Sequence, residues 1–195
     1  MTTNDQYYIS LVIDGDTNAF SVLVDRYKDL VYTLALRMLK NREEAEEVSQ
    51  DTFIKIYKSI NKFKGDSKFS TWVYKVTYNT CLDRLKKNRK HFNDIPINEF
   101  TEHQVKTIDN ALDSLEQEEY SKAIQECIAL LPSEDAFLLT LYYFEELSLE
   151  EISKAVGLKA NNVKVKIFRG RKKLATILRE HLEPEIIESY ERTGR

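Results

Sequence analysis

Residues that interrupt or cross-link a chain are scarce in this sequence. Only five Gly, three Pro and two Cys occur among 195 residues, which excludes a disulfide-rich scaffold and predicts long helices with few breaks. Cys81 and Cys127 have no CxxC partner, so we expect both to be buried free thiols. His91, His103 and His181 lack the spacing of metal ligands, and neither a metal nor another cofactor is predicted.

Long apolar runs are absent as well. The run 30–39 is interrupted by Arg37 and is too short to span a bilayer. The first residues, MTTNDQYY, contain no basic stretch followed by an apolar one, which is the pattern of a signal peptide. We therefore expect a cytoplasmic protein that does not insert directly into a membrane.

Positive charge is not in general excess, because the formal net charge is −3. It is instead concentrated in two places. Residues 159–173 contain seven Lys or Arg and no acidic residue, and residues 84–90 contain five cations. Residues 92–119, in contrast, contain eight Asp or Glu against one Lys and are interrupted by Pro96. The pattern predicts two basic surfaces separated by an acidic linker.

Apolar residues recur at helical spacing on both sides of this linker, which predicts an all-α fold. We expect two small helical domains, at 1–91 and 120–181, joined by the linker at 92–119 and followed by a tail at 182–195. The helices expected in the first domain cover 17–29, 30–39 as a continuation or a restart, 43–60 and 71–90. The expected N-caps are Asp16 or Thr17, Asn41, Ser70 or Thr71, and Ser133.

The helix expected over 43–60 carries different residues on its two faces. Its core stripe consists of Ala45, Val48, Thr52, Phe53, Ile56 and Ile60. The opposite face carries Glu47, Gln50, Asp51, Ile54 and Lys58. An Ile surrounded by polar side chains is typical of a protein-docking patch, but single exposed Ile residues are also common. Face geometry alone leaves both interpretations open.

Aromatic and cationic side chains surround the loop expected at 61–68. Phe63, Phe69 and Trp72 flank its Lys residues, a combination suited to stacking on unpaired bases. The other interpretation, that the rings belong to the core, applies most to Phe69. The next helix is expected to bury Tyr74, Tyr78, Cys81, Leu82 and Leu85 and to expose Trp72, Val76, Asn79, Thr80, Asp83, Lys86 and Lys87. Its five terminal cations exceed what a helix dipole requires and predict phosphate contacts.

Residues 149–174 have the pattern of a helix-turn-helix, with Gly157 in the turn. The predicted inner stripe is Ile152, Val156, Leu158, Val163, Ile167 and Leu174, with the small Ser153 where the helices would cross. Asn161, Asn162, Val165, Arg169 and Lys172 point outward, flanked by Lys164, Lys166 and Lys173. Asn and Arg can recognise base edges, Val165 can meet a thymine methyl, and Lys can hold phosphates. A basic helix also suits acidic proteins or membranes, but the turn favours DNA.

Four linked motifs between about residue 14 and residue 178 together resemble one family, the bacterial extracytoplasmic-function (group 4) sigma factors of RNA polymerase. The motifs are Asp14-Gly15-Asp16 with Ala19-Phe20, Leu23 and Tyr27; Ala45 to Phe53; Phe63 with Phe69 to Tyr74, Asn79 and Asp83-Arg84-Leu85; and Leu131-Pro132 with Leu147 to Leu174. Lys159-Ala160-Asn161-Asn162 stands where the family usually has Ser or Thr, which leaves the promoter sequence undetermined.

The resemblance implies a mechanism with two contacts to promoter DNA. Glu47, Gln50, Asp51 and Ile54 would bind the clamp of the polymerase β′ subunit, and the second domain would sit on the β flap. The residues implied in −10 recognition and melting are Lys62, Phe63, Lys64, Asp66, Ser67, Phe69, Trp72, Asn79, Arg84, Lys86 and Lys87. Those implied at the −35 element are Asn161, Asn162, Lys164, Val165, Lys166, Arg169, Arg171, Lys172 and Lys173. The resemblance also implies control by an anti-sigma factor, often membrane-bound.

Three other hypotheses remain. A helix-turn-helix regulator acting without polymerase explains residues 148–174 but not the Ile54 face or the aromatic loop. An enzyme acting on nucleic acid would need a carboxylate pair, metal cluster or nucleophile with its base, and none stands out, so no catalytic residue is predicted. A helical adaptor that binds only proteins would tolerate charge reversal at Arg169 and Lys172.

Overall fold

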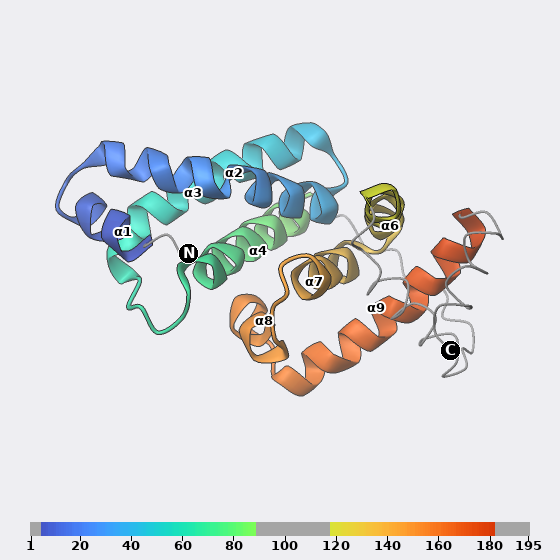
Figure 1. The fold of residues 1–195 in the computed structure, drawn as a ribbon. Helices are drawn as coiled ribbons and strands as arrows, with labels where there is room; N and C mark the ends of the chain where they lie inside the picture. The colour runs from blue at the N-terminus through green and yellow to red at the C-terminus, as the bar shows by residue number, and fades with distance from the viewer. Residues whose placement is uncertain (1–4, 89–117, 182–195) are drawn as a thin grey trace. The chain divides into compact units, whose positions relative to one another are not determined.

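A computed structural model describes residues 5–88 and 118–181, and all regular structure within these ranges is helical, as predicted (Figure 1). The predicted linker, except for Glu118 and Glu119, and the predicted tail lie outside the described residues. The chain groups into two units, residues 1–90 with 150–158 and residues 91–149 with 159–195. Within the described ranges, no helix is long and apolar enough to cross a membrane.

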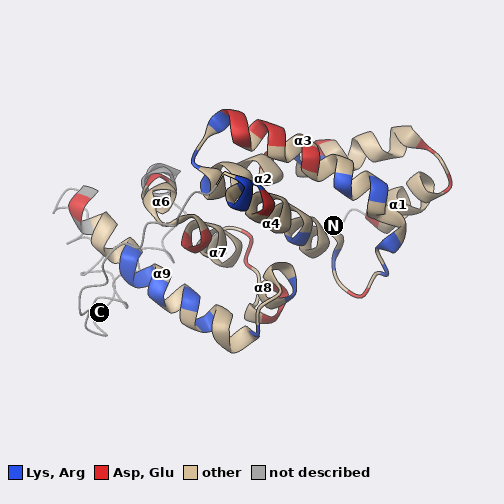
Figure 2. Cartoon of the chain, turned by 180° about the vertical axis from the view of Figure 1, so that it is seen from behind, with Lys and Arg blue, Asp and Glu red and all other residues tan. Residues whose placement is uncertain are grey.

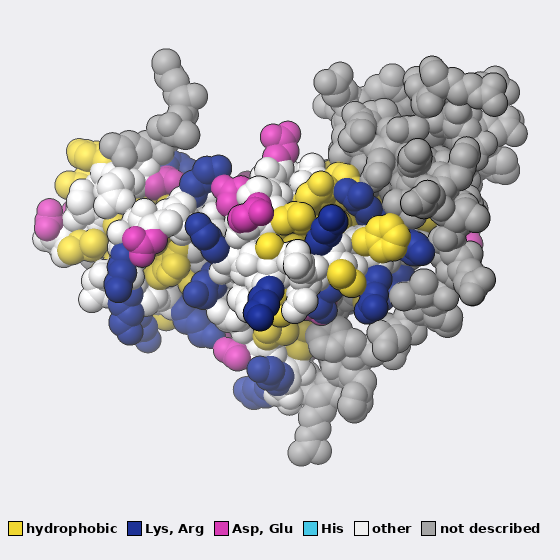
Figure 3. Space-filling view, turned by 90° about the horizontal axis from the view of Figure 1, so that it is seen from below, with side chains coloured by type: hydrophobic (Ala, Val, Ile, Leu, Met, Phe, Trp, Pro, Cys, Tyr) yellow, Lys and Arg dark blue, Asp and Glu magenta, His cyan; other side chains and the backbone are white. Residues whose placement is uncertain are grey.

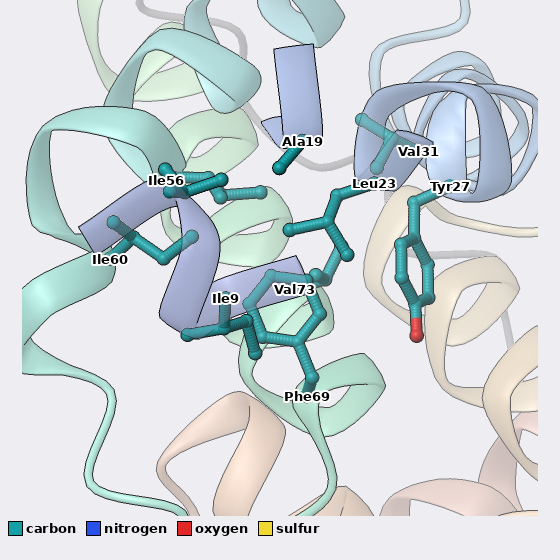
Figure 4. Packing of buried hydrophobic residues seen from close by; sticks show 10 residues of the cluster. Ile9, Ala19, Leu23, Tyr27, Val31, Ile56, Ile60, Phe69 and Val73 are labelled. Carbon is teal, nitrogen blue, oxygen red and sulfur yellow. The ribbon is translucent and has the colours of Figure 1, made fainter. Parts of the chain in front are cut away.

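The first unit is built on four packed helices and a short 3-10 turn. They are α1 (Asp5–Ile13), α2 (Thr17–Leu39), α3 (Arg42–Ser59), η1 (Ile60–Lys62) and α4 (Phe69–Lys87). Helix α2 contacts α1, α3 and α4, and α3 also packs against α4 (Figure 1). In the core, Ile9, Leu23 and Phe69 point toward one another (Figure 4). The helix α8 (Leu149–Val156) groups with this unit.

Side-chain caps begin two of these helices as predicted. The Oδ1 atom of Asp16 accepts from the backbone N–H groups of Asn18 and Ala19, at 2.9 and 3.3 Å. The segment predicted at 30–39 continues α2 without a break, and the helix ends where Lys40 adopts a φ of 57°. Asn41 caps α3 by accepting from the N–H of Glu44 at 2.9 Å. These caps satisfy N–H groups that a helix start leaves free.

Two predicted N-caps were wrong, and one helix was missed. Helix α1 was not predicted, although it buries Ile9 and Val12. Helix α4 already begins at Phe69, so neither Ser70 nor Thr71 is its N-cap; Lys68 takes that position, and its side chain does not cap the helix. Likewise, Pro132 precedes α7, and Ser133 is its first helical residue rather than its cap. Burial of Phe69 and the fixed φ of proline set these starts instead of capping bonds.

Helix α4 is also buried over a wider arc than predicted. Thr80, expected on the exposed face, is buried, as are Thr71, Val73 and Thr77. The cause is that α4 packs against both α2 and α3. Threonine tolerates this burial because its hydroxyl bonds one turn back: Thr77 donates to the carbonyl of Val73 and Thr80 to that of Val76, both at 2.8 Å.

In the part of the second unit that the structure describes, three helices contact one another. They are α6 (Glu118–Leu130), α7 (Ser133–Tyr143) and α9 (Ala160–His181). Their core includes Ile128, Phe137, Leu139, Val163 and Leu174, all with 0 % of their surface exposed. The predicted inner residues Val163, Ile167 and Leu174 are confirmed as buried, whereas Leu158 is half-buried.

The turn between α8 and α9 is fixed by two small residues. Gly157 has a φ of +72°, the left-handed conformation that was predicted for it. Its N–H donates to the carbonyl of Ser153 at 2.9 Å. The hydroxyl of Ser153 in turn donates to the carbonyl of Leu158. Ser153 thus closes the turn through its hydroxyl, a role that its small size alone did not predict.

Candidate docking and nucleic-acid interfaces

Helix α3 presents one buried and one exposed face. Ala45, Val48, Thr52 and Ile56 are buried, as predicted, whereas Phe53 is half-buried. Glu47, Gln50 and Asp51 are exposed, and Ile54 has 50 % of its surface exposed against 1 % for Ile56. Tyr57, 43 % exposed, extends this surface and was missed, although it lies one turn after Ile54. We call Glu47, Gln50, Asp51, Ile54 and Tyr57 the α3 outer face.

Charge on α3 is concentrated near its start. Figure 2 shows that the acidic residues of α3 are gathered toward the start of the helix. They include Glu43 and Glu44 in the first turn, where a carboxylate is favoured by the helix dipole. The α3 outer face therefore combines exposed apolar surface with negative charge, the composition of a docking site for a basic and apolar partner.

Polar contacts connect this face to the end of α4. Arg84, predicted at DNA, donates from Nη1 to Oε2 of Glu47 at 2.7 Å, and its Nη2 lies 3.9 Å from Oδ2 of Asp51. Further along the same pair of helices, Asn88 donates to Glu44 at 2.6 Å. The Arg84 side chain is only 20 % exposed, so most of its surface is engaged within the protein.

The three predicted aromatic rings form one cluster. Ring centroids are 5.4 Å apart for Phe63 and Phe69, and 5.6 Å apart for Phe63 and Trp72 and for Phe69 and Trp72. Phe69 is 4 % exposed and packs against Tyr27 at 5.6 Å, whereas Phe63 and Trp72 are half-buried. The geometry therefore favours the core interpretation for Phe69, and leaves Phe63 and Trp72 as the rings that border solvent.

Exposed polar residues surround this cluster and continue along α4. Lys62, Lys64 and Asp66 are exposed in and beside the loop, and Ser67 is half-buried. Gly65, at a φ of 76°, makes the turn between them. Asn79, Lys86 and Lys87 are exposed on α4, as predicted. Arg89 and Lys90, the last cations of this basic segment, lie outside the described residues.

Helix α9 exposes most of the side chains predicted to meet DNA. Asn161, Asn162, Lys164, Val165 and Arg169 are exposed, whereas Lys172 is half-buried. Phe168 was not predicted at this surface, although it is 45 % exposed beside Val165 at 48 %. The Nζ of Lys172 lies 4.8 Å from the centre of the Phe168 ring, a cation–π contact. Figure 3 shows Lys and Arg side chains next to hydrophobic ones on one face of the molecule.

Three cations of α9 instead contact side chains of α7. Lys166 pairs with Glu134, and Lys173 pairs with Asp135. The guanidinium carbon of Arg171 lies 5.2 and 5.3 Å from the ring centres of Tyr142 and Tyr143. Internal contacts therefore position these cations, which sequence periodicity alone could not show because the partners lie about 30 residues away.

Cysteine and metal chemistry do not add a further site. Cys81 and Cys127 are free and buried, as predicted. Burial raises the pKa of the Cys81 thiol to about 12 and also raises the pKa of Cys127. Within the described ranges, no group of His, Cys, Asp and Glu is arranged to hold a metal ion.

Two family models match the two parts of the chain. Sigma-70 region 2 matches residues 23–91, and Sigma-70, region 4 matches residues 121–174. These regions define an RNA polymerase sigma factor of the sigma-70 class.

Similarity over nearly the full length makes the assignment more specific. The chain is 36% identical to the ECF RNA polymerase sigma factor SigW of Bacillus subtilis, over 88% of this chain and 95% of SigW. It is 33% identical to the RNA polymerase sigma-H factor of Pseudomonas aeruginosa, over 90% of this chain and 96% of that protein. The chain therefore belongs to the extracytoplasmic-function (ECF) sigma factors.

Solved structures agree with this fold. CnrH, in complex with the cytosolic domain of CnrY, matches with a TM-score of 0.57 and 20% identity, over 90% of this chain and 97% of that one. RpoE, in complex with the anti-sigma factor NepR from Bartonella quintana, matches with a TM-score of 0.59 and 15% identity, over 82% and 96%. At these identities, the similarity concerns the fold.

Proposed function

We propose that this ECF sigma factor docks on the β′ clamp of core RNA polymerase through its α3 outer face and directs the enzyme to specific promoters. The observation that carries the proposal is the exposure of Ile54, at 50 %, on a helix whose opposite face buries Ala45, Val48 and Ile56. An apolar side chain among Glu47, Gln50 and Asp51 gives a partner both buried area and charge complementarity. The proposed site of action is the cytoplasm, where polymerase and promoter DNA meet.

The loop after α3 is the proposed binding site for the −10 promoter element. Phe63 and Trp72 border solvent beside exposed Lys62 and Lys64, so a base flipped from the opened strand would stack on a ring while the cations hold its phosphates. Phe69 supports both rings from the core. Along α4, Asn79, Lys86 and Lys87 offer exposed contacts to the adjoining DNA.

Helix α9 is the proposed recognition helix for the −35 promoter element. Its exposed Asn161, Asn162 and Arg169 carry the donors and acceptors that discriminate base edges in a major groove. Val165 and Phe168 add apolar surface suited to a thymine methyl. The resulting contact would select duplex DNA upstream, while the first unit opens the DNA downstream.

Control by an anti-sigma factor is part of the proposal. Two solved structures that match this chain are complexes, one with the cytosolic domain of CnrY and one with the anti-sigma factor NepR. A protein that covers the α3 outer face would compete directly with polymerase. We expect such a partner to present basic and apolar groups to Asp51 and Ile54.

Transcription by the reconstituted holoenzyme tests the function. The purified chain is added to core RNA polymerase, and transcript starts are mapped on genomic DNA. We expect a set of starts that share upstream sequences and that disappear when the chain is omitted. A chain that binds DNA but not core polymerase would contradict the proposal and favour a helix-turn-helix regulator acting alone.

A further inference from the structure

Two adjacent acids in the first turn of α7 bind two lysines of α9. The Nζ of Lys166 lies 2.6 Å from Oε2 of Glu134, and the Nζ of Lys173 lies 2.7 Å from Oδ2 of Asp135. Lys166 and Lys173 are separated by about two helical turns and therefore lie along the same edge of α9. The acids thus bind the cations along one border of the proposed −35 interface.

The two ion pairs differ in their access to water. The side chains of Lys173 and Asp135 are only 10% and 13% exposed, so separating them would leave an unpaired charge in a confined place. Those of Lys166 and Glu134 are 36% and 28% exposed. A partly exposed pair is weak, and one partner can leave it for a phosphate at small cost. Only Lys166 is therefore available for exchange between a carboxylate and DNA.

The position of Lys166 on α9 makes this exchange relevant to DNA binding. Lys166 lies one turn after Asn162 and just under one turn before Arg169, and both of these side chains are exposed. When Asn162 and Arg169 approach base edges, a flexible Lys at the same border of the helix lies near the flanking phosphate backbone. An ammonium that moves toward a phosphate gives up part of its contact with Glu134.

We propose that Glu134 is a positioning residue that withholds Lys166 from DNA phosphates and so lowers the affinity of α9 for duplex DNA of any sequence. The proposal rests on the −35 role proposed above. DNA has to displace the Glu134 carboxylate before it gains the Lys166 contact. Contacts from Asn161, Asn162 and Arg169 do not require this displacement. Binding consequently depends more on base recognition and less on general attraction to the backbone.

A double-mutant cycle on the full chain tests this inference. The affinity for a duplex of arbitrary sequence is measured by fluorescence anisotropy over a range of salt concentrations for wild type, Glu134→Gln, Lys166→Gln and the double variant. Glutamine keeps the shape of glutamate and can still accept a hydrogen bond, so the fold should be retained. Glu126→Gln, an exposed site on α6, is the matched charge control, and thermal unfolding verifies the fold of each variant.

Glu134→Gln should raise the affinity about two- to fivefold and steepen the dependence of log affinity on log salt by about one, the contribution of one added phosphate contact. Lys166→Gln alone should have little effect, and in the Glu134→Gln background it should abolish the gain. Glu126→Gln should leave the slope unchanged.

Other outcomes would overturn the inference. An equal gain from Glu134→Gln in the Lys166→Gln background would show simple repulsion between the carboxylate and DNA. A loss of affinity would show that Glu134 orients Lys166 toward DNA, and no change would show that the pair plays no part. Core-polymerase binding is measured on the same samples, so failure of docking identifies failure of the proposed function separately. Absence of duplex binding at every salt concentration would contradict the inference, whereas the proposed function is judged by docking on core polymerase.

Discussion

The guanidinium of Arg84 is bound by Glu47, with Nη1 of the arginine 2.7 Å from Oε2 of the glutamate. A cation at the basic end of α4 is therefore joined to an acid of the α3 outer face. Lys86 and Lys87, only two and three residues further along the sequence, are exposed. Arg84 is therefore neutralised within the protein, whereas Lys86 and Lys87 project into solvent, although all three belong to one basic run in the sequence.

This separation predicts different effects on DNA binding. Lys87→Gln should reduce the salt dependence of holoenzyme binding to a promoter by about one unit of slope, because it removes one phosphate contact. Arg84→Gln should leave the slope nearly unchanged, since that guanidinium is already paired with Glu47 and only 20% exposed. The slopes are measured by promoter-fragment binding at several salt concentrations. An equal loss of slope in both variants would show that Arg84 leaves Glu47 to contact DNA.

Two isoleucines of α3 provide a matched test of docking. Ile54→Ala should weaken binding to core polymerase and change the free energy of unfolding by no more than about 0.5 kcal/mol, because Ile54 is 50 % exposed. Ile56→Ala should reduce the free energy of unfolding by about 2–5 kcal/mol, because Ile56 is 1 % exposed. Adding Asp51→Ala to Ile54→Ala should weaken docking further while the helical circular-dichroism signal is retained. Unfolding of that double variant would show that the face is buried.

Within the aromatic cluster, we expect Phe69 to stabilise the fold and Phe63 to act in promoter opening. Phe69→Ala should reduce the free energy of unfolding by about 3–5 kcal/mol, because the ring is 4 % exposed among Tyr27, Phe63 and Trp72. Phe63→Ala should instead slow promoter opening. The rate of opening is measured by the permanganate reactivity of unpaired thymines.

A template with a preformed bubble at the −10 position provides the control for that experiment. It should restore transcription by Phe63→Ala, because the variant then no longer has to open the duplex. If the bubble gives no rescue, the defect lies in docking or folding rather than in melting.

Features set by local periodicity and capping could be predicted from the sequence. Asn41 and the acids after it marked the start of α3, and the spacing of Val48, Thr52 and Ile56 defined its buried face. Gly157 marked a left-handed turn for the same local reason. Exposure of Ile54 followed from that periodicity, because it lies opposite the buried stripe.

Features that depend on distant partners could not be predicted in this way. Thr80 was expected in solvent because periodicity describes one buried face, whereas α4 has neighbours on two sides. Lys173 was expected at a phosphate because its sequence neighbours are basic, yet its carboxylate partner, Asp135, lies on another helix. Charge patterns locate basic segments, but tertiary contacts determine which cations remain available to DNA.

Helix α9 predicts a division between promoter choice and general affinity. Asn161→Ala and Arg169→Ala should change which promoters are used, because these exposed side chains can bond base edges. Lys164→Ala should weaken binding to all promoters similarly, because it is exposed and cationic without such discrimination. The measurement is competitive transcription from a randomised −35 library. An unchanged sequence profile for the first two variants would contradict their assignment to base contacts.

Lys173 should behave differently from Lys164. Because it pairs with Asp135 in a place where both side chains are nearly enclosed, Lys173→Ala should lower the unfolding temperature. The general loss of DNA affinity expected from the sequence should then appear only to the extent that the fold is weakened. If Lys173→Ala instead keeps the stability of the wild type and reduces the salt dependence of DNA binding, Lys173 contacts a phosphate as the sequence predicted.

Burial of Cys81 predicts a loss of stability in alkali. Desolvation raises the pKa of its thiol from 9.0 to about 12. Below pH 9 the thiol is protonated in both folded and unfolded chains, whereas above it only the unfolded chain readily loses the proton. The free energy of unfolding should therefore fall between these pKa values, by at most about 1.4 kcal/mol per pH unit from this group.

Cys81→Ala should flatten that dependence, as measured by urea unfolding from pH 9 to about pH 11. Val73→Ala, which truncates another buried side chain of α4, is the control: it should lower stability at every pH but keep the alkaline slope. The comparison of slopes separates ionisation from the cavity that both substitutions create. Equal slopes in the Cys81→Ala variant and wild type would show that the pKa of the Cys81 thiol is the same in the folded and unfolded chains. Solvent would then reach Cys81 in the folded protein.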